Sequence, residues 1–369
     1  MNMKKVLMTA SVWSHIRCFH LPYLEAFQHL GWETHVACTG IPAGAPHVDV
    51  AIELPFKKQM IAPENLGAAH ILRRRIRSER YDLIIAHTTL AAFFTRLAVK
   101  GMKSRPKLVN VMHGYLFDDE TPALKRGVLL SAERLVAPQT DLLLVMNEWD
   151  YRAALKYRLG RRVEMIPGMG VDFSRLDRVS ESREALRDRF GVPRDAFVLL
   201  YAAEFSRRKS QDITIRAMNV LPGNNFLVLC GEGATLEACK ALATALGVEN
   251  RALFPGQVSD MAPWYRIADI AVSASRSEGL PFNLMEAMYC GLPVVASAVK
   301  GHVDLIEDGE NGLLYPYGDS GAFAAQVARL AGDGALRERL GWRAAQDSRG
   351  FALETVLPDV MERYLSVAK

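Results

Sequence analysis

The sequence predicts an α/β protein with two doubly wound, Rossmann-like domains. Its 369 residues exceed one typical domain, and half of them are apolar, enough for two cores. Short β-branched runs alternate with longer helical patterns along the whole chain. The strand-like runs are continuously apolar, which is typical of parallel strands covered by helices on both faces. We therefore expect two parallel sheets, one in each half of the chain.

Each half contains about five predicted strands. In the first half they are Val6–Ala10, Thr34–Cys38, Asp82–His87, Leu108–His113 and Leu142–Met146. In the second half they are Val198–Ala203, Phe226–Cys230, Ala252–Phe254, Ile270–Ala274 and Pro293–Ala298.

The predicted break lies at the turn-rich segment Ile166–Asp172, where a Pro-Gly pair marks a connection. A charged helix, Ser182–Phe190, follows it. We expect domains over 1–168 and 169–350, followed by a C-terminal helix within 351–369.

Composition narrows the class of protein further. A net charge of +4 suits an anionic substrate or a membrane surface and falls short of a nucleic-acid-binding footprint. The five cysteines are scattered without metal-type spacing, so we expect buried free thiols in a reducing compartment. The first apolar run is too short for a signal peptide, and no run of 18 apolar residues occurs. We expect a cytoplasmic protein whose membrane contact, if any, is peripheral.

The most informative segment carries two glutamates eight residues apart. Glu278 lies in a loop, Glu286 lies in a helix that begins near Pro281, and a buried strand begins at Pro293. A helix N-terminus offers free N–H groups and partial positive charge, which suit a phosphate. Carboxylates beside it are placed to accept hydrogen bonds from sugar or ribose hydroxyls. Phosphate and hydroxyls together describe a nucleotide sugar; the simpler alternative is an amphipathic helix with surface glutamates.

This segment, with Glu-Gly-Leu-Pro at its start and Gly-Leu-Pro-Val-Val-Ala at its end, resembles the Glu-x7-Glu signature of retaining glycosyltransferases of family 4. The resemblance implies the GT-B fold, in which two Rossmann-like domains face each other across a cleft and the last helix packs on the first domain. It implies that Glu286 binds the ribose and Glu278 the transferred sugar. The amides of Gly279 and Leu280 would bind the diphosphate.

Basic residues follow the first strand of the second half. Arg207, Arg208 and Lys209 suit a diphosphate leaving group, although a solvated basic turn is the alternative. The loop resembles the family's Gly-Arg-Leu-x-x-x-Lys-Gly, with Lys209 on the lysine. Glu204 stands where the family has arginine, which resembles a subgroup that builds bacterial capsule and exopolysaccharide.

Three further residues of the second half fit the donor side of that pattern. Gly231 and Gly233 open a helix after a strand and allow close approach of a ligand, as they also would in a plain strand-to-helix turn. Val258, in Gly-Gln-Val, resembles the loop that contacts the base.

In the first half, His113 follows a strand and resembles the histidine that reaches the donor sugar, although Leu116 replaces the family's second histidine. His87 ends another strand and resembles a residue that faces the acceptor. His15 and Arg17 lie where many relatives have a Gly-Gly loop, and resemble the same subgroup. For these four residues, ordinary turn or helix-capping roles remain alternatives.

The sequence contains no convincing Asp-x-Asp metal site, Walker loop or zinc pattern. We expect no cofactor and no metal, with helix ends and basic side chains neutralising the phosphates. Basic stretches at 73–80 and 125–134 suit an anionic lipid surface, or a solvated helix face equally well.

The resulting hypothesis is a retaining hexosyltransferase. It would move a sugar from a nucleotide donor, UDP being favoured by family frequency alone, to a glycan or polyprenyl-diphosphate-linked acceptor in bacterial surface polysaccharide synthesis. The alternatives are a GT-B nucleotide-sugar epimerase and a non-catalytic subunit that binds nucleotide sugar or glycan. The sugar, acceptor, linkage and oligomeric state are left open.

Overall fold

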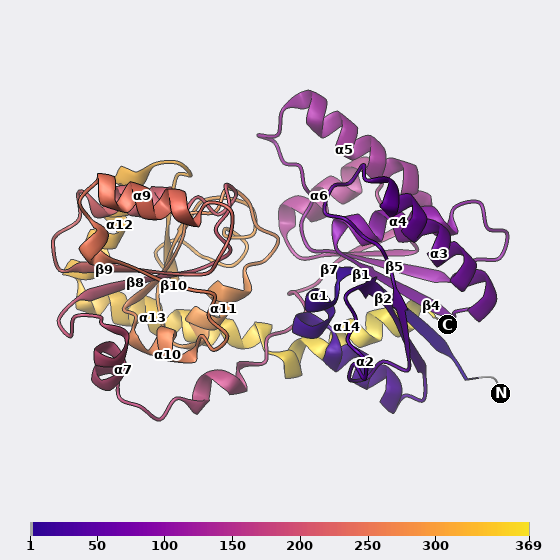
Figure 1. Cartoon of the computed structure of the whole chain (residues 1–369), viewed down its shortest axis with the longest axis horizontal. Coiled ribbons are helices and arrows are strands. Elements are labelled where there is room, and N and C mark those ends of the chain that lie inside the picture. Colours follow the sequence, from indigo (N-terminus) through magenta and orange to yellow (C-terminus); the bar gives the residue numbers. More distant parts are fainter. Residues whose placement is uncertain (1–2, 369) are drawn as a thin grey trace. The chain divides into compact units, whose positions relative to one another are not determined.

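The structure is a computed structural model that describes residues 3–368 and separates into two compact units (Figure 1). The N-terminal unit runs to Gly170 and also includes the residues from Glu354 onward. The C-terminal unit is the continuous segment Val171–Leu353. Its limits lie two or three residues beyond the predicted domain limits of 168 and 350.

The N-terminal unit contains a seven-stranded parallel sheet in the order β3-β2-β1-β4-β5-β6-β7. The strands are β1 (Lys5–Val12), β2 (Glu33–Thr39), β3 (Val50–Glu53), β4 (Leu83–His87), β5 (Lys107–Met112), β6 (Leu142–Val145) and β7 (Arg162–Met165). The helices are α1 (Trp13–Phe19), α2 (Leu21–His29), α3 (Pro63–Glu79), α4 (Thr89–Val99), α5 (Ala123–Val136), α6 (Glu148–Tyr157) and α14 (Leu353–Val367), with the short 3₁₀ helix η1 (Ala137–Gln139).

The core of this unit follows from its apolar strands. Every residue of β4 is buried, and α3 and α4 cover one face of the sheet with side chains such as Leu72, Ile76 and Phe94. A strand buried on both faces has no polar side, which explains why these segments are continuously apolar.

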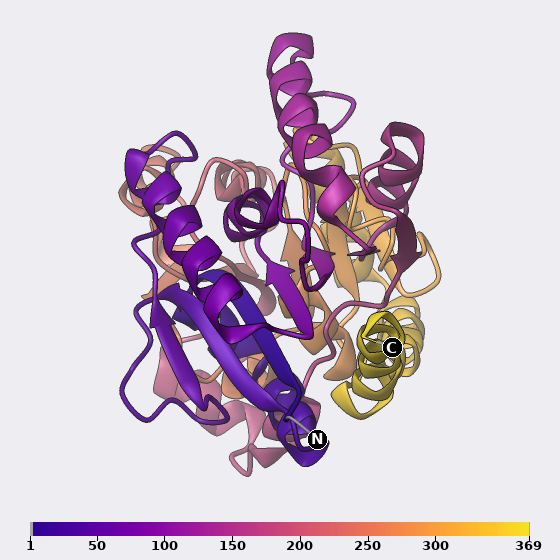
Figure 2. The same ribbon diagram turned by 90° about the vertical axis from the view of Figure 1, so that its right-hand side faces the viewer.

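The C-terminal helix α14 closes the N-terminal unit from the far end of the chain. It lies within the range 351–369 predicted for the last helix, and Figure 2 looks onto its end. The buried Tyr364 ring stacks on Phe27 and meets the edge of Tyr23, both on α2. Aromatic contacts of this kind stabilise a packed pair beyond the area that they bury.

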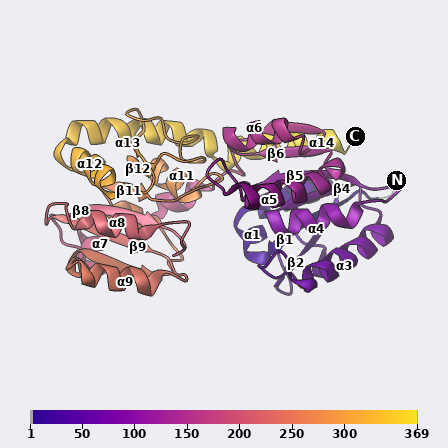
Figure 3. The ribbon, with the colours of Figure 1, turned by 90° about the horizontal axis from the view of Figure 1, so that it is seen from above.

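The C-terminal unit contains a six-stranded parallel sheet in the order β10-β9-β8-β11-β12-β13. Figure 3 labels the neighbouring strands β9 and β8, and β11 and β12. The strands are β8 (Phe197–Ala202), β9 (Asn225–Cys230), β10 (Ala252–Gly256), β11 (Ile270–Ser273), β12 (Val294–Ser297) and β13 (Gly312–Tyr315). The helices are α7 (Arg183–Phe190), α8 (Gln211–Met218), α9 (Leu236–Ala245), α10 (Ala262–Ile267), α11 (Phe282–Tyr289), α12 (Ser320–Gly332) and α13 (Gly334–Ser348), with η2 (Phe173–Arg178), η3 (Glu249–Arg251) and η4 (Arg349–Phe351).

All ten predicted strands are present, and three others were missed: β3, β7 and β13. Each has only four residues and lies at the edge of its sheet. An edge strand has one neighbour, and β3 and β7 are partly exposed, so they do not need the long apolar run that identifies a central strand. β13, Gly-Leu-Leu-Tyr, is largely buried but too short to form such a run. The expectation of about five strands per half was therefore too low.

The cysteines correct another expectation. Cys38, Cys230 and Cys239 are buried, as predicted, whereas Cys18 and Cys290 are exposed. Both exposed residues lie at or near the ends of helices, α1 and α11, where an apolar sequence neighbourhood does not guarantee burial. Across residues 3–368, no helix is both long and apolar enough to cross a membrane.

Candidate active site

The predicted donor-binding residues gather at one edge of the sheet in the C-terminal unit. The strands β10, β9, β8 and β11 are neighbours and run parallel, so the loops that follow them emerge at the same edge. These loops carry Val258, Gly231 with Gly233, the basic residues 207–209, and Glu278. Ligands of open α/β sheets bind at this carboxyl edge. The residues predicted to bind the donor therefore lie at the edge where a ligand is expected.

Glu278 is buried and forms two ion pairs. Lys209 Nζ lies 2.5 Å from one of its carboxylate oxygens, and Arg208 Nη1 lies 2.8 Å from the other. Burial alone would raise the pKa of Glu278, but the charges of Lys209 and Arg208 outweigh it and lower the pKa to about 2. The carboxylate is therefore ionised at neutral pH and acts as an acceptor, consistent with a partner that donates hydroxyl protons.

The rest of this loop lies close to Glu278. Arg208 also donates to the carbonyl of Ser277 over 2.8 Å, which ties the loop after β8 to the loop after β11. Gly279 and the buried Leu280 follow Glu278 directly, before α11 begins at Phe282. Arg207 is exposed.

Glu286 lies inside α11 and is held by residues that the sequence analysis missed. The hydroxyl of Tyr265, on α10, donates to one carboxylate oxygen over 2.9 Å, and Arg175, in η2, forms an ion pair with the other. Tyr265 and Arg175 lie on other elements, at no characteristic sequence distance from Glu286. The sequence pattern around Glu286 therefore does not predict them. Arg175 does follow the Pro-Gly-x-Gly-Val-Asp turn by three residues, the one feature that draws attention to it.

Gly231 and Gly233 are required by close backbone contacts. Both have φ in the region that favours glycine, +142° and +148°. A Cβ atom would come within 2.0 Å of the Ala203 carbonyl oxygen at Gly231, and within 2.2 Å of the Phe205 carbonyl oxygen at Gly233. The two glycines thus keep the loops after β8 and β9 in contact, beside a cavity of about 330 Å³ that Glu204, Gly231 and Val258 help to line.

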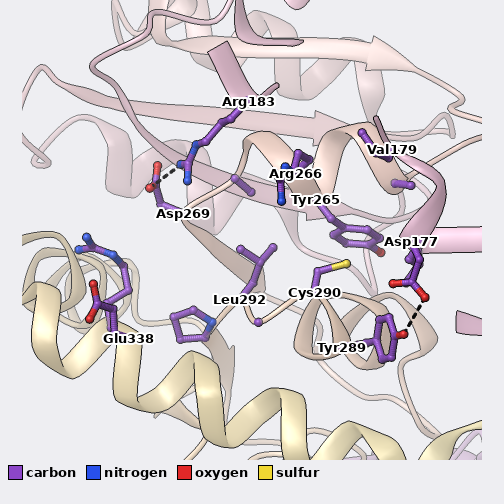
Figure 4. Close-up of a pocket in the computed structure, with 16 residues that line it drawn as sticks. Asp177, Val179, Arg183, Tyr265, Arg266, Asp269, Tyr289, Cys290, Leu292 and Glu338 are labelled. Atoms are coloured by element: carbon purple, nitrogen blue, oxygen red, sulfur yellow. Dashed lines mark hydrogen bonds and ion pairs between the residues drawn. The ribbon is translucent and has the colours of Figure 1, made fainter. Parts of the chain in front are cut away.

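A larger cavity of about 660 Å³ lies elsewhere in this unit (Figure 4). Its lining includes Asp269, just before β11, and Pro293, just before β12, so it lies at the amino ends of these strands. Its charged groups include pairs within the wall, such as Arg183 with Asp269 at 2.6 Å. Neither glutamate of the motif lines it, so volume alone does not identify the site.

The N-terminal unit brings the three predicted histidines together at its own carboxyl edge. His87 ends β4, His113 follows β5, and His15 lies on α1 directly after β1; these strands are neighbours in the sheet. His113 Nε2 lies 3.4 Å from His87 Nδ1, and the His15 and His113 rings meet edge to face at 4.6 Å. A fourth histidine, His20, stacks on His87 at 3.6 Å and was not singled out from the sequence.

Burial keeps these imidazoles neutral. It lowers the pKa of His15 to about 4, and burial together with the neighbouring histidines lowers the pKa of His20, His87 and His113 well below the usual value. Arg17 is exposed and stands two residues after His15 on the same helix, where side chains point in different directions.

Comparison with known proteins identifies the class. Residues 182–347 match the family described as glycosyl transferases group 1, and residues 21–168 match the glycosyl transferase 4-like domain. A Bacillus subtilis relative described as a glycosyltransferase, EpsD, is 33% identical over 367 residues, covering 98% of this chain and 96% of that protein. The chain therefore belongs to this glycosyltransferase family, and is a transferase with the GT-B fold.

Two further proteins show how this chain is related to others. LpsE of Rhizobium meliloti, a lipopolysaccharide core biosynthesis glycosyltransferase, is 34% identical over 171 residues, 46% of this chain and 50% of LpsE. The crystal structure of HepE from Anabaena in complex with UDP superposes with a TM-score of 0.78 at 22% identity, covering 99% of this chain and 100% of HepE. HepE has also been solved in complex with UDP-glucose, with a TM-score of 0.80. The structural likeness supports the fold.

Proposed function

We propose that this protein is a retaining glycosyltransferase that takes a sugar from a UDP-sugar donor. The observation that carries the proposal is the arrangement around α11, where Glu278 lies beside the basic residues Arg208 and Lys209, and Glu286 lies eight residues further on within the helix. The two carboxyl groups supply acceptors for hydroxyl groups, and the two cations supply charge for a diphosphate. The complexes of HepE with UDP and UDP-glucose support a UDP-sugar as donor.

Each residue takes a role suited to its surroundings. Glu286 accepts hydrogen bonds from the ribose, while Tyr265 holds its carboxylate in place. The cavity beside Val258 and Gly231 accommodates the base. Glu278 accepts hydrogen bonds from the transferred sugar, which requires its ion pairs with Lys209 and Arg208 to loosen as the donor binds.

Those two cations then interact with the diphosphate. Breaking the bond between the anomeric carbon and the phosphate oxygen leaves an additional negative charge on the nucleotide. Lys209 and Arg208, with Arg207 and the amides of Gly279 and Leu280, stabilise that charge most strongly as it develops. The acceptor attacks from the face that the nucleotide leaves, and a phosphate oxygen takes its proton, so the configuration is retained. This route uses no metal and no protein base.

The acceptor is proposed to be a glycan or a polyprenyl-diphosphate-linked sugar of a bacterial surface polysaccharide, with His113 orienting the donor sugar and His15, Arg17 and His87 on the acceptor side. The relationship to LpsE supports this class of pathway. Helix α5 supports a peripheral membrane contact, since Leu124 and Val128 are 84% and 64% exposed beside the basic Lys125. Such a face suits an anionic lipid surface.

The proposal is tested by thermal stabilisation with UDP, GDP, ADP and dTDP and their sugars, with and without EDTA, followed by product analysis. We expect EDTA-insensitive stabilisation by UDP and a UDP-sugar, and transfer with the anomeric configuration kept. An epimerised donor, or binding without transfer to any acceptor, would refute it. In the same assay Glu278→Gln should reduce transfer at least ~100-fold while UDP still binds, because its carboxylate contacts the sugar. Equal loss of both would remove Glu278 from that role.

A further inference from the structure

The four histidines of the N-terminal unit form a cluster that the proposed transfer reaction does not fully use. One ring nitrogen from each of His15, His20, His87 and His113 lies within 4.8 Å of all the others. Among the described residues, buried ring nitrogens of three of them lack a hydrogen-bond partner: Nε2 of His15, both nitrogens of His20, and Nε2 of His87.

Unpartnered buried nitrogens are unusual because a buried polar group that makes no hydrogen bond loses its contact with water and gains nothing in return. The cluster consists of four imidazoles with no carboxylate among them, so no ion pair within it stabilises the rings. An ion bound by His15 Nε2 together with His87 Nδ1 and His113 Nε2 would give the buried nitrogen of His15 a partner.

We propose that His15, His87 and His113 form a binding site for a first-row transition metal ion, with Zn²⁺ as the ion that its geometry suits best. Imidazole is a preferred ligand of Zn²⁺, and three protein ligands with an open fourth position is a common arrangement.

The distances fit this assignment. With Zn–N bonds of about 2.0–2.1 Å, tetrahedral ligand nitrogens lie roughly 3.4 Å apart and the ring centroids about 5 Å apart. The nitrogens of His87 and His113 are 3.4 Å apart. The centroids of the three rings are separated by 4.6, 5.6 and 6.1 Å. One separation is shorter than this ideal and two are longer, so the rings must shift to close on an ion, from a starting point at which their nitrogens lie within 4.8 Å of one another.

His20 does not belong to the ligand set. Its ring lies nearly parallel to that of His87, with centroids 3.6 Å apart and an interplanar angle of 24°. Two rings stacked so closely cannot both direct a nitrogen at tetrahedral positions of one ion. His20 instead holds the His87 ring in place from the buried side.

The ion also has a route into the site. His20 and His87 are fully buried, but His15 and His113 are partly exposed, so the cluster is open on one side. The ligands come from the ends of β4 and β5 and from α1, elements that the sheet holds in fixed register. No carboxylate in the cluster orients the rings, so we expect a labile ion.

Occupancy would also affect transfer, a consequence that rests on the proposed function. A metal on His113 takes the nitrogen that we expect to face the donor sugar, so Zn²⁺ should inhibit the reaction. The binding itself does not depend on any glycosyltransferase activity and is measured without a donor.

The test is a titration of metal-stripped, untagged full-length protein with Co²⁺, followed by the visible d–d absorption of tetrahedral Co²⁺ and by displacement with Zn²⁺. We expect one equivalent to bind, and His15→Ala and His87→Ala each to weaken binding at least ~100-fold. His70→Ala, an exposed histidine on α3 of the same unit, should bind Co²⁺ like the wild type. Circular dichroism shows whether each variant is folded, and His15→Ala keeps the test valid if His87→Ala is not. Absence of the absorption, or binding that survives His15→Ala, would overturn the proposal.

Discussion

Replacing Glu278 with glutamine should destabilise the C-terminal unit by an amount that depends on pH. The side chain keeps its shape, but Lys209, whose side chain is only 12% exposed, loses its partner. The pKa of Glu278 falls from its ordinary 4.5 to about 2 in the folded protein. A difference of one in pKa corresponds to about 1.4 kcal/mol of free energy. The free energy of unfolding of Glu278→Gln at pH 7 should therefore be lower by about 3 kcal/mol.

The sign of the pH dependence follows from the direction of the shift. A carboxyl whose folded-state pKa is lowered contributes its full stabilisation above the unfolded-state pKa, and loses it as pH falls toward the folded-state value. The difference between wild type and Glu278→Gln should thus be constant above about pH 5 and shrink between about pH 4.5 and 2. At pH 3.5 roughly 2 kcal/mol should remain.

The assay must report on the unit that contains Glu278, because two units need not unfold together. Hydrogen exchange of the β11 amides, measured at increasing urea concentration, meets this need because all residues of β11 are buried. Glu307→Gln is a matched control, since Glu307 is 66% exposed and its contact with Arg343 is 3.8 Å, which should change stability by less than about 0.5 kcal/mol. A Glu278→Gln variant as stable as the wild type, or a difference that persists unchanged at pH 3.5, would refute the reasoning.

Three further predictions follow from the same structure. Glu286→Ala should weaken UDP binding at least ~10-fold by calorimetry, since it removes the acceptor assigned to the ribose; an unchanged affinity would exclude that role. Gly231→Ala should lower the free energy of unfolding by about 3 kcal/mol or more in urea titrations, because its Cβ meets a backbone oxygen at 2.0 Å. Gly247→Ala, also at positive φ but with nothing within 4 Å, should cost about 1 kcal/mol, and equal effects would contradict the steric argument. Replacing Leu124 and Val128 with serine should reduce co-sedimentation with anionic vesicles without changing the melting temperature; unaltered co-sedimentation would remove α5 as the membrane contact.

The sequence predicted the central elements of the fold because burial on both faces requires continuous apolar runs. Strands such as β4 and β8 therefore appear in the sequence as apolar segments, while β7, exposed at a sheet edge, reads Arg-Val-Glu-Met and resembles a loop. Edge strands are determined by pairing with a neighbour, which a single sequence does not display.

The candidate site was predictable to a similar degree. Glu278 and Glu286 share one short segment, so their spacing reveals them, and the resemblance to a family added Lys209. Tyr265 and Arg175 come to Glu286 from separate elements, and only the folded chain brings them there. His20 was missed for a related reason, because its stacking on His87 depends on how α1 follows β1 rather than on any sequence interval.

The helix α14 has a consequence for the order in which the protein is made. Tyr364 packs on Tyr23 and Phe27, so α2 is covered only after α14, a segment far later in the chain, has been synthesised. The intervening unit, Val171–Leu353, is continuous and needs nothing from either terminus to complete its sheet. During synthesis, domains generally mature from the N-terminus onward. Here the order is reversed in part, since the N-terminal unit keeps an apolar face of α2 uncovered until α14 has been synthesised, which follows the whole C-terminal unit.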